Sequence, residues 1–113
     1  MEKIYFTLTG TGFRYGQAFM ERGMPVHLQK EPDNAYDQEA IRVHMDGLGL
    51  VGYVANSTKT VVGESFSAGR LYDRIGDTAE GEILYVLPNS VLCVLTSAVT
   101  DEIFDAEKEE DNA

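Results

Sequence analysis

Six short apolar runs, each bounded by glycine or other turn formers, constrain the fold of this chain most strongly. In residues 3–9, Ile4, Phe6 and Leu8 alternate with polar residues, which is the period of a half-buried β-strand. The run VLCVLTSAV is apolar at both parities, as in a strand that is covered on both faces. The predicted strands span residues 3–9, 25–30, 39–45, 50–54, 82–87 and 91–99.

The connections between these runs favour an antiparallel arrangement. DGLG at 46–49 is a hairpin signal, and the segment 31–38, EPDNAYDQ, is dense in turn formers. Asn56 or Ser57 is a candidate cap for a helix through 58–64, and a second helical turn is expected within 67–75. We therefore predict a mainly β domain with a short helical insertion, folded as a small six-stranded antiparallel barrel that hides its edges.

The net charge of -10 is distributed unevenly along the 113 residues. Residues 101–113 contain seven acidic residues and one basic residue, whereas residues 1–100 carry a net charge of only -4. We expect one folded domain over 1–100 and an acidic, disordered tail over 101–113. The total charge argues against nucleic acid, but the charge of the folded part argues against it much less.

Several classes of protein are disfavoured by the sequence. It has no apolar run long enough for a membrane span, and its first ten residues lack the apolar core of a signal peptide. The single cysteine cannot form an internal disulfide. We expect a cytoplasmic protein that makes no membrane contact.

No catalytic or metal-binding pattern is evident. Cys93 lies within an apolar strand and is expected to be buried and inert. His27 and His44 are out of step with the core residues and should face away from the core. The acidic residues of 31–38 do not follow the spacing of an EF-hand. The sequence predicts neither an enzyme nor a bound cofactor.

Two loops each place an aromatic residue beside a charged one: FRYG at 13–16 and NAYD at 34–37. Aromatic rings stack on nucleobases, and an arginine binds phosphate or a base edge. A carboxylate disfavours continuous phosphate backbone but accepts a hydrogen bond from a sugar hydroxyl, so its presence favours a strand terminus. The structural alternative is that Phe13, Tyr15 and Tyr36 fill the ends of the barrel.

The order of these motifs resembles the HIRAN domain family. The resemblance lies in GFRYG, VHLQKEPDNAYD, AIRV and VGYV, and it extends from about Gly10 to Val54, with a looser fit through about Val99. It implies an OB-like or SH3-like barrel of about 100 residues. Related domains often precede DNA-remodelling ATPases, where they grip the 3′ end of single-stranded DNA. We expect this chain, too short for a motor, to be a stand-alone, bacterial-type member.

The resemblance also implies roles for individual residues. Arg14 and Tyr15 match the pair that contacts the terminal nucleotides in DNA-binding members. Asn34, Tyr36 and Asp37 match the second loop, in which the aromatic ring packs on the end base and the aspartate meets the 3′ hydroxyl.

This sequence departs from the family pattern where phosphate is bound. Gly16 replaces a second aromatic residue, Tyr53 stands where some members have histidine, and Asn56 stands where a phosphate-binding lysine can occur. Lys59 is then the nearest base, and Ala35 replaces a usual proline. We therefore expect weakened phosphate contacts. The predicted nucleic-acid-binding residues are Arg14, Tyr15, Asn34, Tyr36, Asp37, Tyr53, Asn56 and Lys59.

Two functions remain open on the sequence. The first is a module that binds single-stranded DNA ends. The second is a protein-interaction or small-ligand module on the same barrel, with a partner such as a DNA-processing enzyme. The sequence does not establish whether 13–16 and 34–37 form one cleft.

Overall fold

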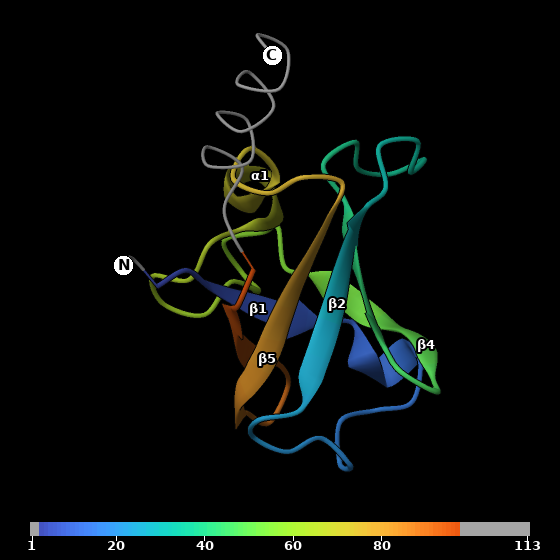
Figure 1. Cartoon of the computed structure of the whole chain (residues 1–113), viewed down its shortest axis with the longest axis vertical. Coiled ribbons are helices and arrows are strands. Elements are labelled where there is room, and N and C mark those ends of the chain that lie inside the picture. Colours follow the sequence, from blue (N-terminus) through green and yellow to red (C-terminus); the bar gives the residue numbers. More distant parts are fainter. Residues whose placement is uncertain (1–2, 98–113) are drawn as a thin grey trace, which may run out of the picture.

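The computed structural model describes residues 3–97, and the expectations for the tail and for residues 98–99 lie outside this range. Within it, six antiparallel strands form a closed barrel in the order β1-β4-β3-β2-β5-β6, with β6 pairing back to β1 (Figure 1). The predicted barrel is therefore confirmed. The strands are β1 (Tyr5–Thr9), β2 (Pro25–Lys30), β3 (Ile41–Met45), β4 (Gly49–Val54), β5 (Thr78–Val86) and β6 (Val91–Leu95), with a 3-10 turn η1 (Thr11–Phe13) and one helix α1 (Ala68–Tyr72).

The alternating residues face the interior as their period predicts. Ile4, Phe6 and Leu8 are all nearly or fully buried, and the inward residues of β2 and β3 are buried with them. Gly52 lies on β4 beside the end of β1, and a Cβ there would lie 2.4 Å from the carbonyl oxygen of Thr9. Only glycine allows the two strands to approach so closely.

The predicted helix over 58–64 is wrong. Residues 57–60 form a turn in which the carbonyl of Ser57 accepts hydrogen bonds from the amides of Thr60 and Val61, both at 2.9 Å. The β-branched residues of this segment favour helix poorly, and Gly63 adopts a φ of 53°, which ends any helical continuation.

This segment instead covers the outer face of β1. The Thr7 side chain accepts from the amide of Val62 at 3.1 Å and shares a 2.8 Å hydrogen bond with Ser65. Thr7, on the polar face of its strand, is consequently fully buried. The second helical turn is confirmed as α1, with the Ser67 side chain accepting from the amide of Arg70.

The last two strands differ from their predicted bounds. β5 begins at Thr78 rather than at residue 82, because residues 78–81 pair with β2. On β6, Val91 and Cys93 point into the core, whereas Leu92 and Val94 line a groove on the outside. Val94 is only 8% exposed, so the centre of the strand is covered on both faces as predicted, whereas Leu92 is half-buried.

Both histidines lie on the outer surface as predicted, and they face each other across β2 and β3. Their rings are 5.5 Å apart, edge to face. His27 also contacts Glu80 on β5 and Asp46 in the β3–β4 turn, the latter at 3.0 Å. This cluster connects three neighbouring elements on one side of the barrel.

Cys93 is buried as predicted. Burial raises the pKa of its thiol to about 12, so the thiol stays protonated and unreactive at neutral pH. Among residues 3–97, no helix has the length and apolar character that a membrane crossing requires.

Candidate nucleic-acid interface

Asn34 organises the loop between β2 and β3. Its side-chain oxygen accepts hydrogen bonds from the amides of Tyr36 and Asp37, at 2.8 and 3.0 Å. Its side-chain amide donates to Glu31 at 2.6 Å. Asparagine forms such side-chain-to-backbone turns readily. The turn leaves the Tyr36 side chain 98% exposed, so this ring does not fill the barrel end.

The carboxylate of Asp37 is held on two sides. One oxygen accepts from the Asn56 side-chain amide and the other from the backbone amide of Glu39, each at 2.9 Å. A carboxylate oxygen accepts more than one hydrogen bond, so each oxygen retains capacity for an incoming donor. Asp37 is thus a fixed, half-buried acceptor one residue after an exposed aromatic ring.

Asn56 links this loop to helix α1. Its side-chain oxygen accepts from the amide of Gly69 at 2.8 Å while its side-chain nitrogen donates to Asp37. A Cβ at Gly69 would lie 3.3 Å from that oxygen and 2.7 Å from the carboxylate of Glu39. The glycine therefore permits close approach, and Asn56 acts here as a structural clamp.

A second polar contact connects the loop to the barrel wall. The Tyr53 hydroxyl on β4 donates to Glu31, at 3.0 and 3.2 Å from its two carboxylate oxygens. Arg42, opposite Tyr53 on β3, lies 3.8 Å from the same carboxylate. We call this connected outer surface the polar strip; it comprises Glu31, Asn34, Asp37, Arg42, Tyr53 and Asn56.

The first loop reaches the other end of the same face. Gly10, with a φ of 76°, starts a turn in which the Thr11 carbonyl accepts from the amides of Arg14 and Gly16, both at 2.9 Å. Phe13 is 92% exposed and Tyr15 is 57% exposed, so these rings also do not fill the barrel. Together with Arg14 they line a hollow of about 430 Å³ against the β3–β4 hairpin.

The charges of Arg14, in the first loop, and of Glu31, in the second, both act on the pKa of Tyr53. Burial, together with the hydrogen bond and charge of Glu31, raises the pKa of Tyr53, while the charges of Arg42 and Arg14 oppose that rise. Arg14 therefore acts on the same phenol that contacts the second loop. The phenol stays protonated at neutral pH and remains a donor to Glu31.

The predicted residues consequently lie along one outer face rather than in one closed cleft. The face follows β4 from Leu50, beside the first loop, to Asn56, beside the second, which is about 20 Å at strand spacing. Figure 1 shows residues 31–40 leaving one end of β2 while residues 10–24 approach the other end. Lys59 stands apart, exposed in the 57–60 turn.

Glu31 and Arg42 are two residues of this surface that the sequence reasoning did not select. Glu31 is the acceptor for both Asn34 and Tyr53, and Arg42 is the cation closest to it. Their signal was available: Arg42 alternates out of step with the core of its strand, and Glu31 opens the turn-rich segment. Among residues 3–97, no three His, Cys, Asp or Glu side chains gather in a way that would hold a metal ion.

The fold and the surface are those of a small antiparallel β-barrel binding domain. Its two loops present aromatic and polar groups on one face. Comparison with known proteins agrees: the family model for the HIRAN domain matches residues 1–91, and the chain belongs to that family. HIRAN domains are generally DNA-binding modules and are not themselves catalytic.

A solved structure shares this fold. The crystal structure of the HIRAN domain of human HLTF aligns with a TM-score of 0.54 over 82% of this chain and 74% of that chain, at 17% identity. At this identity the likeness establishes the fold alone. No curated protein sequence matches the chain.

Proposed function

We propose that this protein binds single-stranded DNA at its 3′ end, without catalysing a reaction. The observation that carries the proposal is that an exposed aromatic ring, Tyr36, is followed directly by a carboxylate held in place by hydrogen bonds, Asp37. The exposed ring of Tyr36 offers a stacking surface for a terminal base, worth about 1–3 kcal/mol. The clamped carboxylate of Asp37 offers an acceptor for a terminal hydroxyl.

A terminal hydroxyl suits Asp37 better than a phosphate does. A hydroxyl donates a hydrogen bond to the carboxylate, whereas a phosphate at that position would bring like charges together. Arg14, at the far end of the face, would then meet the strand upstream of its end. The polar strip therefore gives the bound strand a direction.

Phosphate contacts are few on this face. Arg42 is held by Glu31, and Asn56 is engaged with Asp37 and Gly69. Arg14 and the more distant Lys59 are the cations among the predicted residues. Because each phosphate contact on a single strand contributes about −0.7 to the slope of log affinity against log salt, one or two contacts predict a slope of about −0.7 to −1.4.

The test is a fluorescence-anisotropy titration at low salt with two short single strands of one sequence, ending in a 3′ hydroxyl or a 3′ phosphate. We expect the hydroxyl strand to bind more tightly. A duplex of the same sequence with blunt ends is the control, because its terminal base is stacked and unavailable to Tyr36. Absence of binding by either single strand would refute the proposal.

A protein-interaction module is the second candidate, and the outer groove beside β6 favours it. That groove has a volume of about 630 Å³ and is lined by apolar and aromatic side chains together with Lys3, Arg22, Glu64 and Glu82. Binding of a protein partner together with absence of DNA binding would support this function over the first.

A further inference from the structure

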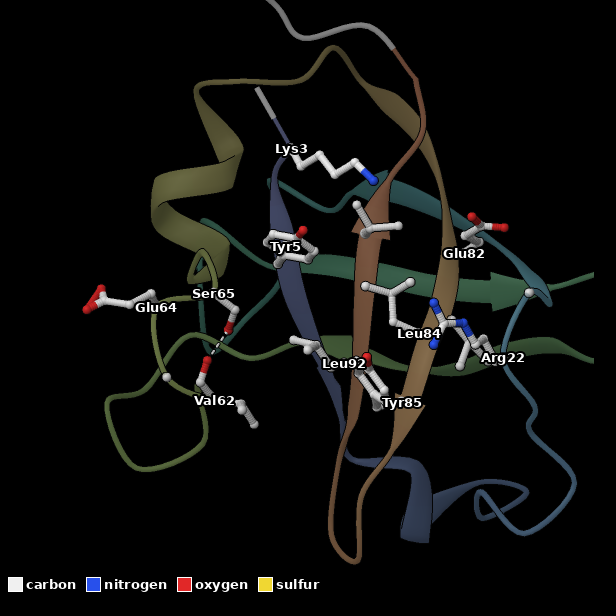
Figure 2. A pocket seen from close by; sticks show the side chains of 14 residues that line it. Lys3, Tyr5, Arg22, Val62, Glu64, Ser65, Glu82, Leu84, Tyr85 and Leu92 are labelled. Atoms are coloured by element: carbon white, nitrogen blue, oxygen red, sulfur yellow. Dashed lines mark hydrogen bonds between the residues drawn. The ribbon is translucent and has the colours of Figure 1, made fainter. Parts of the chain in front are cut away.

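A groove with several apolar side chains lies on the side of the barrel formed by β1, β6 and β5 (Figure 2). Tyr5, Val94 and Glu82 are paired across the three strands in one row, and Leu92 and Tyr85 are paired in the next. Tyr85 is 54% exposed and Tyr5 is 39% exposed. We call this surface the apolar groove; it comprises Tyr5, Leu84, Tyr85, Leu92 and Val94.

Charged residues stand around the apolar groove. Figure 2 shows Lys3 reaching toward β6 at one end and Arg22 beside Leu84 at the other. The Arg22 guanidinium carbon lies 5.3 Å from the centre of the Tyr85 ring, a cation–π contact. Glu82 and Glu64 also border the groove. Because two bases and two acids border the groove, its rim carries no net charge; an occupant needs large apolar side chains first, and carboxylates suit it only beside Lys3 and Arg22.

The sequence of β6 also indicates an occupant. The centre of its run VLCVLTSAV is apolar on both faces: Val91 and Cys93 face the core, Val94 is 8% exposed and Leu92 is only half-buried. Leu92 and Val94 face the groove instead. A strand that is apolar on both faces is typical of one covered on both sides.

We propose that the chain's own segment around Ile103 and Phe104 docks in the apolar groove. These two apolar residues interrupt the acidic sequence 101–113, with acidic residues at 101, 102 and 105 on either side of them. This pattern, two large apolar side chains between carboxylates, complements an apolar floor between Lys3 and Arg22.

The distance to be spanned permits this docking. Val94 precedes Ser97, the last described residue, by three positions, which is about 10 Å along a strand. Five residues separate Ser97 from Ile103, and they can span about 20 Å when extended. Because the segment is tethered, its effective concentration near the groove is on the order of millimolar, so weak contacts suffice.

Tryptophan fluorescence tests the proposal in the full chain, which contains no tryptophan. In the variant Phe104→Trp, we expect blue-shifted emission that is protected from a soluble quencher, independently of protein concentration. The matched control Asn112→Trp places the probe near the chain end, where we expect emission typical of water.

Groove variants identify the docking surface. Leu92→Glu in the Phe104→Trp background should abolish the blue shift, whereas Leu50→Glu, on the face with the polar strip, should not. Because Leu92 is half-buried, Lys3→Glu at the exposed rim provides a second variant that leaves the core intact, and it should weaken the shift. Water-like emission of the probe, or a blue shift that grows with protein concentration, would overturn the proposal.

Discussion

The polar strip and the apolar groove occupy opposite walls of one barrel. They differ in whether their side chains are hydrogen-bonded to neighbouring residues. Side chains of the strip are hydrogen-bonded to one another, so Asp37 and the turn at Asn34 are positioned before any ligand arrives. The groove presents Tyr5, Leu92 and Tyr85 without comparable polar contacts. The first surface is suited to directional recognition, and the second to burial of apolar groups.

The closed barrel explains how both surfaces coexist. In its strand order, β1 separates β4 from β6 on one side and β2 separates β3 from β5 on the other. A change on one wall should therefore leave the other intact unless it disturbs the barrel itself.

Gly52→Ala should lower the stability of the fold most, because it disturbs the close contact between β1 and β4, on which the whole barrel depends. The added Cβ would lie 2.4 Å from the Thr9 carbonyl oxygen and 2.8 Å from the Leu8 side chain. We expect a loss of about 1–3 kcal/mol in the free energy of unfolding, measured by urea denaturation. Gly12→Ala, where a Cβ meets open space, is the control and should change little. Equal stability of the two variants would contradict this packing.

Tyr36→Ala should distinguish most clearly between the polar strip and the apolar groove as the surface that binds DNA. Because the ring is 98% exposed, its removal should leave stability unchanged while weakening single-strand binding by about 1–3 kcal/mol. Tyr85→Ala, in the apolar groove, is the matched tyrosine control and should bind DNA normally. If the two variants lose affinity equally, the polar strip is not the specific surface for DNA.

Asn34→Ala should weaken DNA-end recognition by disturbing the conformation of the 34–37 loop, and not by removing a direct contact with DNA. It removes the acceptor for the amides of Tyr36 and Asp37 and the donor to Glu31. We expect the free energy of unfolding to fall by about 1 kcal/mol in total, because none of the three partners is fully buried, together with weaker preference for a 3′ hydroxyl. Asn34→Asp keeps the acceptor for the two amides but places a second carboxylate beside Glu31, so it should recover only part of that preference in the same titration. Full preference in Asn34→Ala would show that the turn needs no side-chain acceptor.

The smallest predicted effect is on the pH dependence of stability. Desolvation lowers the pKa of His27, but the hydrogen bond and charge of Glu80, with those of Asp46, outweigh it and raise the pKa above 6.5. This stabilisation is present below pH 6.5 and is lost as the pH rises through the folded-state pKa. His27→Gln should therefore cost more stability under mildly acidic conditions than under alkaline ones.

His44 serves as a control because its pKa is shifted in the opposite direction from that of His27. Desolvation, followed by the charges of His27 and Arg42, lowers its pKa, so the fold favours the neutral ring. His44→Gln should gain stability relative to the parent as the pH falls below 6.5, by the same linkage. Thermal unfolding across this range measures both variants, and parallel pH profiles for the two would contradict the assignment.

The sequence predicted the barrel well because alternation determines which face of a strand is buried. Ile4, Phe6 and Leu8 illustrate this: their spacing alone placed them in the core. The helix predicted over 58–64 is absent because the β-branched residues that follow the candidate cap favour helix poorly. Thr7 was unpredictable from alternation, since its burial comes from the distant segment around Val62.

The candidate surface was only partly predictable. Spacing and family resemblance selected Asn34, Tyr36 and Asp37, but they did not reveal that Asn56 is a clamp on Asp37. Nor did they reveal Glu31, whose role depends on Tyr53, more than twenty residues away in sequence. Such contacts are set by strand register, which the sequence pattern alone does not give.

The most direct test of the central claim combines the wild-type protein and Asp37→Asn with strands ending in a 3′ hydroxyl or a 3′ phosphate. Asparagine keeps an oxygen that can accept from Asn56 but removes the negative charge. We predict that the wild type prefers the hydroxyl strand by about tenfold, which is about 1.4 kcal/mol, and that Asp37→Asn loses most of this preference. Equal affinity of the wild type for both strands, or an undiminished preference in Asp37→Asn, would contradict recognition of the 3′ end by Asp37.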